Sequence, residues 1–375
     1  MPSISLTPAQ FQQRFSDFVP QVVDLEKMIF ETGANRLDAI GGVLQSVGLP
    51  HHAVDGAGIV ADLGSSHKAS QGVAVRVVAH SPHHGAQHDD FRLASVVGLG
   101  LLLFLQQIGE LPRPLRVLFE SQNSDARTSV RHLIENGGLS GVSEIVGLDC
   151  NPAVPVGQVG LKSGAILPSS AHFEMTLSRN SKEVVRTSSA DLIQAAAHVM
   201  ISLNQMLTRR VDPLQPARLA YTSISGSSST GSEPDLIAIS GLIHAADEEA
   251  VARISSLLED ELHALTGAFE AVFQFKLGPH NQMVCNDADC ARRVQHACQE
   301  AMGKNNVIGL EFLNKDFAGF AEYLRHVPAA ILHISSHENL RRGQLSAADA
   351  EQWLDRVVQT GIKCLSRFVC NYAGV

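Results

Sequence analysis

Short β-favouring runs alternate with helix-patterned segments through the first half of the chain, and this alternation restricts the fold most strongly. The runs GIVADLG, GVAVRVVAH, LRVLFE and EIVGLDC are rich in valine, isoleucine and leucine and are bounded by turn-forming residues. Helix-patterned segments separate the last three runs, at about residues 91–108 and 126–136. Strands that alternate with helices predict an α/β fold with a doubly wound, mostly parallel sheet.

Chemically notable side chains stand where three of these predicted strands end. His80 follows the run VRVVA, the segment ESQNSD (residues 120–125) follows LRVLF, and Asp149 follows EIVGL. Ligands of doubly wound sheets bind in the crevice beyond the carboxyl ends of the strands. The sequence therefore predicts a functional site at this edge of the sheet.

The middle of the chain has a different pattern. Residues 169–278 predict the order strand, helix, strand, strand, helix, strand, which is the order of a ferredoxin-like α+β domain. The run GSSSTGSEPD within it predicts a hairpin loop rather than a phosphate-binding loop. We expect a catalytic-type domain formed by residues 1–168 and 279–375, interrupted by a lid and dimerisation domain at 169–278.

Composition argues against several classes of function. A formal net charge of −9 on 375 residues provides no basic surface for nucleic acid. We expect no secretory signal and no membrane span, because the most apolar run, residues 96–105, is about half the length that a span needs. The six cysteines form no CxxC pair, which is typical of reduced thiols in a cytoplasmic protein.

The stretch HHGAQHDD, residues 83–90, contains three histidines and two aspartates, which are residue types that bind divalent metals. For His83, His84 and Asp90 a solvated loop is the favoured interpretation, because polar loop residues are common. His88 and Asp149 are better candidates for a site, because both are expected beside strand ends.

Seven segments carry a family resemblance that spans nearly the whole chain. They are GAGIVADLG, HGAQHDD, LRVLFESQNSD, GLDCNPAVPVGQVGLKSG, RRVDPLQPARLAYTSISG, KDFAGFAEYL and AILHISSHENL. In this order they resemble the aminoacylase, hippurate hydrolase and indoleacetyl-amino-acid hydrolase family of co-catalytic metallopeptidases. The resemblance implies a catalytic domain that holds two metal ions, and a lid domain that completes the substrate pocket and often forms a homodimer.

In that family two divalent ions about 3.5 Å apart polarise the substrate amide and acidify a water, whose proton a neighbouring carboxylate takes. By the resemblance, His80, His88 and Asp149 correspond to one of the two metal positions. His333 matches the last ligand histidine, and His337 is its neighbour. The resemblance thus implies His80, His88, Asp149 and His333 as the remaining metal ligands.

Three other positions depart from the family pattern. Ala86 stands where the family has a thiolate ligand, Asn123 where it has the general base, and Ser124 where it has a glutamate ligand. None of these side chains carries the negative charge that a pair of cations requires. Asp125 or Glu120 would substitute for the missing carboxylates only if the loop shifted by a residue or more.

Three positions in the predicted lid domain also differ from the residues that the family has there. Lys182 falls near the family's lid histidine, Gly231 on the asparagine that meets the substrate carboxylate, and His244 on the lid arginine. The resemblance therefore implies Lys182, Gly231 and His244 as the residues at the substrate-binding positions of the lid.

Two hypotheses about function follow. In the first, the protein binds or acts on an amino-acid-like or N-acyl-amino-acid ligand in the crevice, and the two-metal amide hydrolysis is lost. In the second, it is an active amide hydrolase that holds one zinc or manganese ion at His80, His88 and Asp149, with Asp89 or Asp125 as the proton acceptor. Because loss of a general base typically costs ~10²–10⁴ in rate, the first is favoured. A structural partner that uses the lid face is a third possibility.

Overall fold

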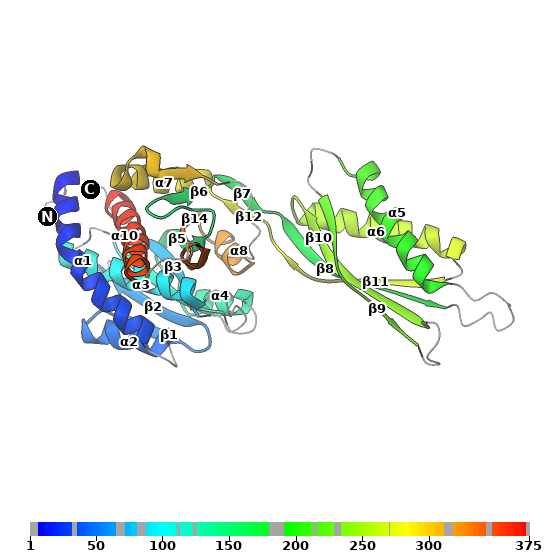
Figure 1. The fold of residues 1–375 in the computed structure, drawn as a ribbon, viewed down its shortest axis with the longest axis horizontal. Coiled ribbons are helices and arrows are strands. Elements are labelled where there is room, and N and C mark those ends of the chain that lie inside the picture. The colour runs from blue at the N-terminus through cyan, green and yellow to red at the C-terminus, as the bar shows by residue number, and fades with distance from the viewer. Residues whose placement is uncertain are drawn as a thin grey trace. The chain divides into compact units, whose positions relative to one another are not determined.

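The computed structural model describes residues 7–31, 36–64, 72–80, 88–109, 111, 113–122, 126–179, 191–212, 215, 217–228, 234–269, 271–310, 318–342 and 347–372. The chain forms two compact units (Figure 1). Unit 1 consists of Met1–Ile166 and Cys285–Val375, and unit 2 consists of Leu167–Val284. Each unit has its own hydrophobic core.

Unit 1 is built on an eight-stranded sheet with the order β1-β2-β4-β3-β5-β14-β6-β13. The strands are β1 (His51–Val54), β2 (Gly58–Leu63), β3 (Gly72–His80), β4 (Leu115–Ser121), β5 (Val142–Asn151), β6 (Val159–Leu161), β13 (Val307–Gly309) and β14 (Ala329–Ser335). The four central strands β4, β3, β5 and β14 are parallel, whereas β1, β2 and the β14–β6 pairing are antiparallel. The predicted mostly parallel α/β sheet is confirmed.

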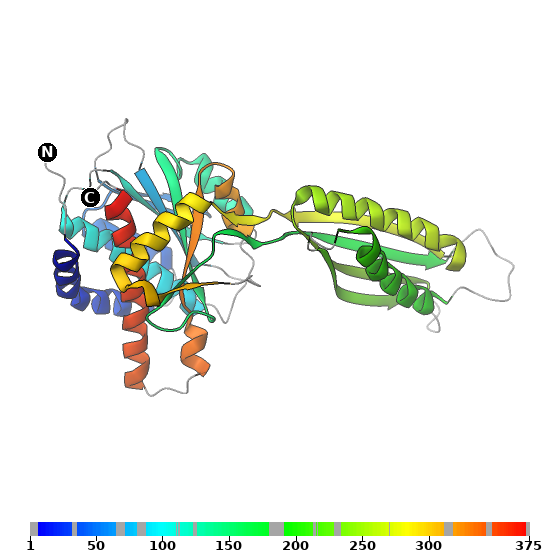
Figure 2. The ribbon, with the colours of Figure 1, turned by 90° about the horizontal axis from the view of Figure 1, so that it is seen from above.

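Helices cover both faces of this sheet (Figures 1 and 2). They are α1 (Pro8–Glu31), α2 (Arg36–Ser46), α3 (His88–Ile108), α4 (Ala126–Glu135), α7 (Ala288–Met302), α8 (Ala318–Leu324), α9 (His337–Arg342) and α10 (Ala347–Tyr372), with a 3₁₀ turn at Lys304–Asn306. Successive strand residues point to opposite faces. Val75 and Val77 join the core with α3 and α10, whereas the Arg76 guanidinium lies 5.9 Å from the ring centroid of Phe320 on α8. The sheet is therefore doubly wound.

Helix α3 is the core helix of unit 1. By length and composition alone, Asp89–Ile108 is apolar enough to cross a membrane, but 72% of that stretch is buried inside the protein. Gly100 lets α3 approach α10, because a Cβ at this position would lie 2.4 Å from Ile362 Cδ1. The apolar composition of α3 is thus accounted for by packing.

Unit 2 has the order β8 (Ser169–Arg179), α5 (Leu192–Arg210), β9 (Ala217–Ser227), β10 (Leu236–Ala245), α6 (Glu248–Phe269) and β11 (Ala271–Asn281). Its strands form an antiparallel sheet in the order β11-β8-β10-β9, and both helices contact this sheet. This is the predicted ferredoxin-like arrangement, including the β9–β10 hairpin. A separate two-stranded sheet of β7 (Gly164–Leu167) and β12 (Val284–Asn286) forms where the chain passes between the units.

Candidate functional site

The carboxyl ends of the four central strands lie side by side, as parallel strands require. β3 ends at His80, β4 ends at Ser121, and β5 and β14 place Asp149 and His333 opposite each other. The amide of Gln122 donates a hydrogen bond to the His80 carbonyl over 2.8 Å, which ties the ends of β3 and β4 together. We call His80, Asp149 and His333 the strand-end site.

Asp149 and His333 form the centre of this site. The His333 Nδ1 atom lies 3.3 Å from Asp149 Oδ2. The His333 side chain is 1% exposed and that of Asp149 is 21% exposed. The partly exposed Asp149 carboxylate can accept a hydrogen bond from a ligand, and the buried His333 imidazole lies beside it. The resemblance selected both of these residues.

A buried charge network lies on the same face of the sheet. The Arg76 guanidinium donates two hydrogen bonds to the Glu120 carboxylate, at 2.7 and 2.9 Å, and Gln122 donates a third at 2.8 Å. Burial opposes the charge on Arg76, but the attraction to Glu120 outweighs it and raises the pKa of Arg76. Burial, followed by the Glu120 charge, raises the pKa of the Tyr323 phenol well above its usual value.

This network determines what Glu120 can do. Its carboxylate is 0% exposed and fully engaged with Arg76, Gln122 and, at 3.4 Å, the Tyr323 hydroxyl. It is therefore not free to replace the missing general base or metal ligand. The sequence did not predict the Arg76–Glu120 pair, although a lone arginine within the apolar run GVAVRVVAH was a signal for it.

Residues at the start of α3 form a second group beside the site. Asp89 Oδ2 lies 3.4 Å from His337 Nδ1, and Asp89 Oδ1 lies 3.3 Å from Arg92 Nη1. The prediction of a solvated loop at Asp90 is wrong. Asp90 is 8% exposed and accepts hydrogen bonds from the Ser336 hydroxyl and the His337 amide, at 2.8 and 2.7 Å. Its carboxylate satisfies the first donors of α9, which the sequence pattern around His337 did not predict.

Arg36 adds a further cation to this group. Its Nη1 donates a hydrogen bond of 2.5 Å to the carbonyl of Ala79, the residue before His80. Burial and the charge of Arg92 lower the pKa of Arg36 to about 10, and the Asp89 carboxylate offsets part of this effect. The Arg36 and Arg92 guanidinium groups offer N–H donors and positive charge of the kind that binds carboxylates.

The remaining predicted residues fall into two groups. Ala86, Asn123, Ser124, Asp125, Lys182 and Gly231, with His83 and His84, lie outside the described residues, and of His88 only the backbone at the start of α3 is described. His244 lies on β10 of unit 2, opposite Ser170 and Arg218, and burial and the Arg218 charge lower its pKa. The roles assigned to these residues stay predictions.

Two divalent ions would require several anionic or imidazole ligands at the strand-end site. Asp149, His333 and His80 are competent ligand types. Among the side chains that the structure describes, no three His, Cys, Asp or Glu residues form a metal-binding group. The sequence places Ala, Asn and Ser at three positions where the family resemblance requires anionic groups. By that resemblance, these residues would supply less negative charge to two dications than the family's ligands do.

Comparison with known proteins agrees with the sequence pattern. No family model matches the chain. A protein of Synechocystis named as a probable hydrolase is 26% identical over 79% of this chain and 80% of its own length. The N-acetyl-L-cysteine deacetylase of Bacillus subtilis is 29% identical over 67% of this chain and 60% of its own length. An indoleacetyl-amino-acid hydrolase of Arabidopsis thaliana is 24% identical over 34% of this chain and 30% of its own length.

Solved structures share the whole fold at low sequence identity. A proposed aminohydrolase from methicillin-resistant Staphylococcus aureus covers 98% of this chain and 100% of its own length with a TM-score of 0.73 and 14% identity. A dinuclear metal-binding peptidase of the M20 family from Bacillus subtilis covers 96% of this chain and 99% of its own length with a TM-score of 0.71 and 17% identity. By sequence, the chain is similar to N-acetylcysteine deacetylases and indoleacetyl-amino-acid hydrolases, and by fold it is similar to an aminohydrolase and an M20-family peptidase.

Proposed function

We propose that the strand-end site binds or acts on an amino-acid-like or N-acyl-amino-acid ligand, and that the two-metal amide hydrolysis of the family is lost. The observation that carries this proposal is the set Ala86, Asn123 and Ser124 at the positions of a thiolate, a base and a glutamate. The engagement of Glu120 with Arg76 supports it, since it occupies one of the two alternative carboxylates.

The described side chains offer complementary groups to such a ligand. Arg36 and Arg92 attract a carboxylate through charge and directed N–H donors. Asp149 accepts a hydrogen bond from an amide or ammonium group, and His333 positions the Asp149 carboxylate from 3.3 Å. Because Asp149 is partly exposed, a ligand can reach it without displacing the buried His333.

The second hypothesis keeps amide hydrolysis with a rearranged site. It would hold one zinc or manganese ion at His80, His88 and Asp149 and use Asp89 or Asp125 as the proton acceptor. The observation in its favour is the position of Asp89 beside His337, at 3.4 Å and 20% exposed. It predicts one bound equivalent of metal that is lost in Asp149→Ala.

The test is calorimetric titration of the whole protein with N-acetyl-L-glutamate and N-acetyl-L-cysteine, together with an assay for released acetate. We expect saturable binding without acetate release, and about tenfold or more weaker binding in Arg36→Gln. The matched control Arg209→Gln, on an exposed residue of α5, should bind as the unaltered protein does. Release of acetate that depends on Asp149 would favour the single-metal hydrolase instead.

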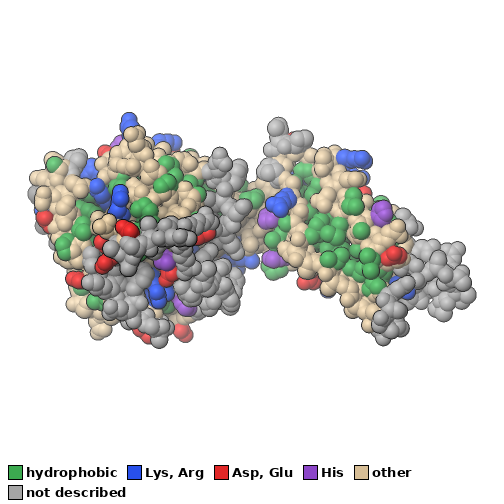
Figure 3. All heavy atoms as spheres, in the orientation of Figure 1, with side chains coloured by type: hydrophobic (Ala, Val, Ile, Leu, Met, Phe, Trp, Pro, Cys, Tyr) green, Lys and Arg blue, Asp and Glu red, His purple; other side chains and the backbone are tan. Residues whose placement is uncertain are grey.

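We also propose that the protein is a cytoplasmic homodimer that associates through unit 2. The support is the distribution of exposed large hydrophobic side chains in the described part of the chain. Apart from Met28, they all lie in unit 2: Ile193, Ile201, Ile224, Leu236, Val272 and Leu277. Figure 3 shows hydrophobic side chains gathered on the visible face of that unit. Contiguous exposed apolar surface is typical of protein interfaces.

A further inference from the structure

Unit 1 has a cavity of about 400 Å³ that is lined in part by α1, α10 and the loop at residues 155–158. Its polar lining includes Gln12, Gln158, Asn306 and Gln359, together with Arg356 and Lys363. No aspartate or glutamate is among the lining residues that the structure describes. The volume lies within the range of small-molecule sites, which is roughly 300–1,000 Å³.

Arg356 and Lys363 are the two cationic side chains among the described lining residues of this cavity. Within the described ranges, no carboxylate forms an ion pair with Arg356 or Lys363. Lys363 is only partly exposed, and burial lowers the pKa of its ammonium group. The two residues are seven apart on α10, so they lie on one face about 10.5 Å apart along the axis. The loop backbone approaches the exposed Arg356, since a Cβ on Gly157 would lie 3.5 Å from Nη2.

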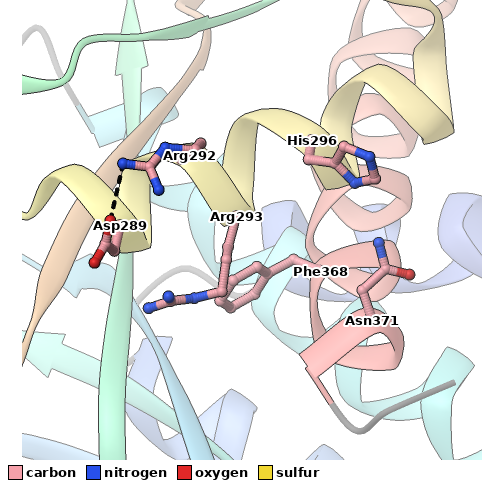
Figure 4. Close-up of a pocket in the computed structure, with 6 residues that line it drawn as sticks. All are labelled: Asp289, Arg292, Arg293, His296, Phe368 and Asn371. Carbon is pink, nitrogen blue, oxygen red and sulfur yellow. Dashed lines mark ion pairs between the residues drawn. The ribbon is translucent and has the colours of Figure 1, made fainter.

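A neighbouring cavity shows the contrast (Figure 4). It measures about 300 Å³ and is lined by Arg292, Arg293, His296 and Phe368 among others. There each arginine has an acidic partner, and the histidine lies near a glutamate. Arg292 lies 2.9 Å from Asp289, Arg293 pairs with the buried Glu144, and His296 lies 3.7 Å from Glu300. The arginines of that cavity thus have acidic partners, whereas the described residues supply none to Arg356 or Lys363.

We propose that the cavity at Arg356 and Lys363 is a binding site for a small anionic molecule that carries carboxylate or phosphate groups. The two cations supply the attraction, and the amide side chains around them supply hydrogen-bond donors to the anion. This site is independent of the strand-end site and of its proposed function.

The test is calorimetric titration of the whole protein with inorganic pyrophosphate and, separately, with succinate. We expect one saturable site for at least one of them, and about tenfold or more weaker binding in Arg356→Gln/Lys363→Gln. Tighter pyrophosphate binding would indicate a phosphate ligand, and tighter succinate binding a carboxylate ligand. The control Arg209→Gln/Arg292→Gln, which removes the same charge elsewhere, should bind within about twofold of the unaltered protein.

Equal binding by the unaltered protein and Arg356→Gln/Lys363→Gln, or no saturation with either anion up to about 10 mM, would overturn the proposal. A second measurement decides the matter if that variant fails to fold. In the unaltered protein, saturating anion should protect Lys363 from an amine-acylating reagent, read by peptide mass spectrometry, and should leave the exposed Lys276 of unit 2 unprotected. Unchanged acylation of Lys363 would refute the site.

Discussion

At the scale of single residues, the Arg76–Glu120 pair is the most consequential contact beside the site. The side chains are 5% and 0% exposed, so each charge depends on the other for its compensation. Removing one partner leaves a buried charge without a counter-ion, whereas replacing both with apolar groups does not. The two kinds of variant should therefore differ in stability.

We predict that Glu120→Gln lowers the free energy of unfolding by about 3–5 kcal/mol. The double variant Arg76→Met/Glu120→Met should be less destabilised than the sum of its two single variants. Urea unfolding measures both. The control Arg292→Met removes a pair whose side chains are 72% and 67% exposed and should change stability by less than about 1 kcal/mol. An unchanged unfolding midpoint for Glu120→Gln would contradict the assignment.

The sequence predicted part of this chemistry and missed the rest for a physical reason. Asp149 was found because residues at strand ends are placed by the sheet itself, and His333, which pairs with it across β5 and β14, was found through the family resemblance. Asp90 and its contacts with Ser336 and His337 were missed because they join positions 246 and 247 residues apart. Such residues come together only in the tertiary structure, so the local sequence pattern does not predict their contacts.

At the scale of elements, β2 and β4 pair so closely that one position admits only glycine. Gly58 has a φ of +145° and pairs with Glu120, and a Cβ there would lie 2.1 Å from the Phe119 carbonyl oxygen. Backbone atoms cannot move aside as a flexible side chain can. The β2–β4 pairing, and with it the position of Glu120, depends on this residue.

Gly58→Ala should destabilise the protein by more than about 1 kcal/mol in chemical denaturation. The control Gly42→Ala lies in α2 with no atom within 4 Å of the new Cβ, and it should stabilise by about 0.5–1 kcal/mol. The interpretation of β2 fails if Gly58→Ala unfolds at the same urea concentration as the unaltered protein.

Glu300 on α7 joins that helix to the end of α10, where Arg367 and Asn371 donate hydrogen bonds of 2.9 and 2.7 Å to it. Burial raises the pKa of Glu300, but these hydrogen bonds and the Arg367 charge outweigh it and leave the pKa below the ordinary 4.5. A carboxylate with a lowered pKa in the folded state stabilises above its unfolded pKa. This stabilisation is lost as the pH falls through the folded value.

We therefore expect Glu300→Gln to cost about 0.2–1 kcal/mol at pH 7 and progressively less below the ordinary pKa of 4.5. Urea unfolding at pH 7, 5 and 3.5 measures the difference between the two proteins. Glu135→Gln, at the exposed end of α4, is the matched control with no such pH dependence expected. A difference that stays constant across these pH values would refute the contribution of Glu300.

Long elements were predictable and very short ones were not. The pattern of apolar residues predicted α3 and the strands β3, β4 and β5, because each has enough positions to define a face or a buried run. The three-residue strands β6, β12 and β13 have too few positions for a period. As a result, the antiparallel contact of β14 with β6, through His333 and Gly160, was not predicted.

At the scale of the whole molecule, the proposed dimer makes a direct prediction about association. Ile201 on α5 and Ile224 on the edge strand β9 are each 56% exposed, and the Tyr221 hydroxyl of β9 donates a hydrogen bond to the Met200 carbonyl of α5. These adjoining elements form the candidate interface. Ile201→Asp/Ile224→Asp should give a monomer in light scattering after gel filtration.

The control Met28→Asp replaces an exposed apolar side chain of α1 in unit 1 and should leave the dimer intact. Association has to be measured at several protein concentrations, since dimer content depends on concentration. A monomeric unaltered protein, or a dimer that persists in the double variant, would reject this interface.

The central claim, that this relative has lost its two-metal centre, is tested most directly by elemental analysis of protein purified without chelator and equilibrated with zinc or manganese. With Ala86, Asn123 and Ser124 in place of anionic groups, we predict fewer than two tightly bound equivalents per chain and no metal-dependent cleavage of N-acetyl amino acids. Two tightly bound equivalents accompanied by that cleavage would contradict the account.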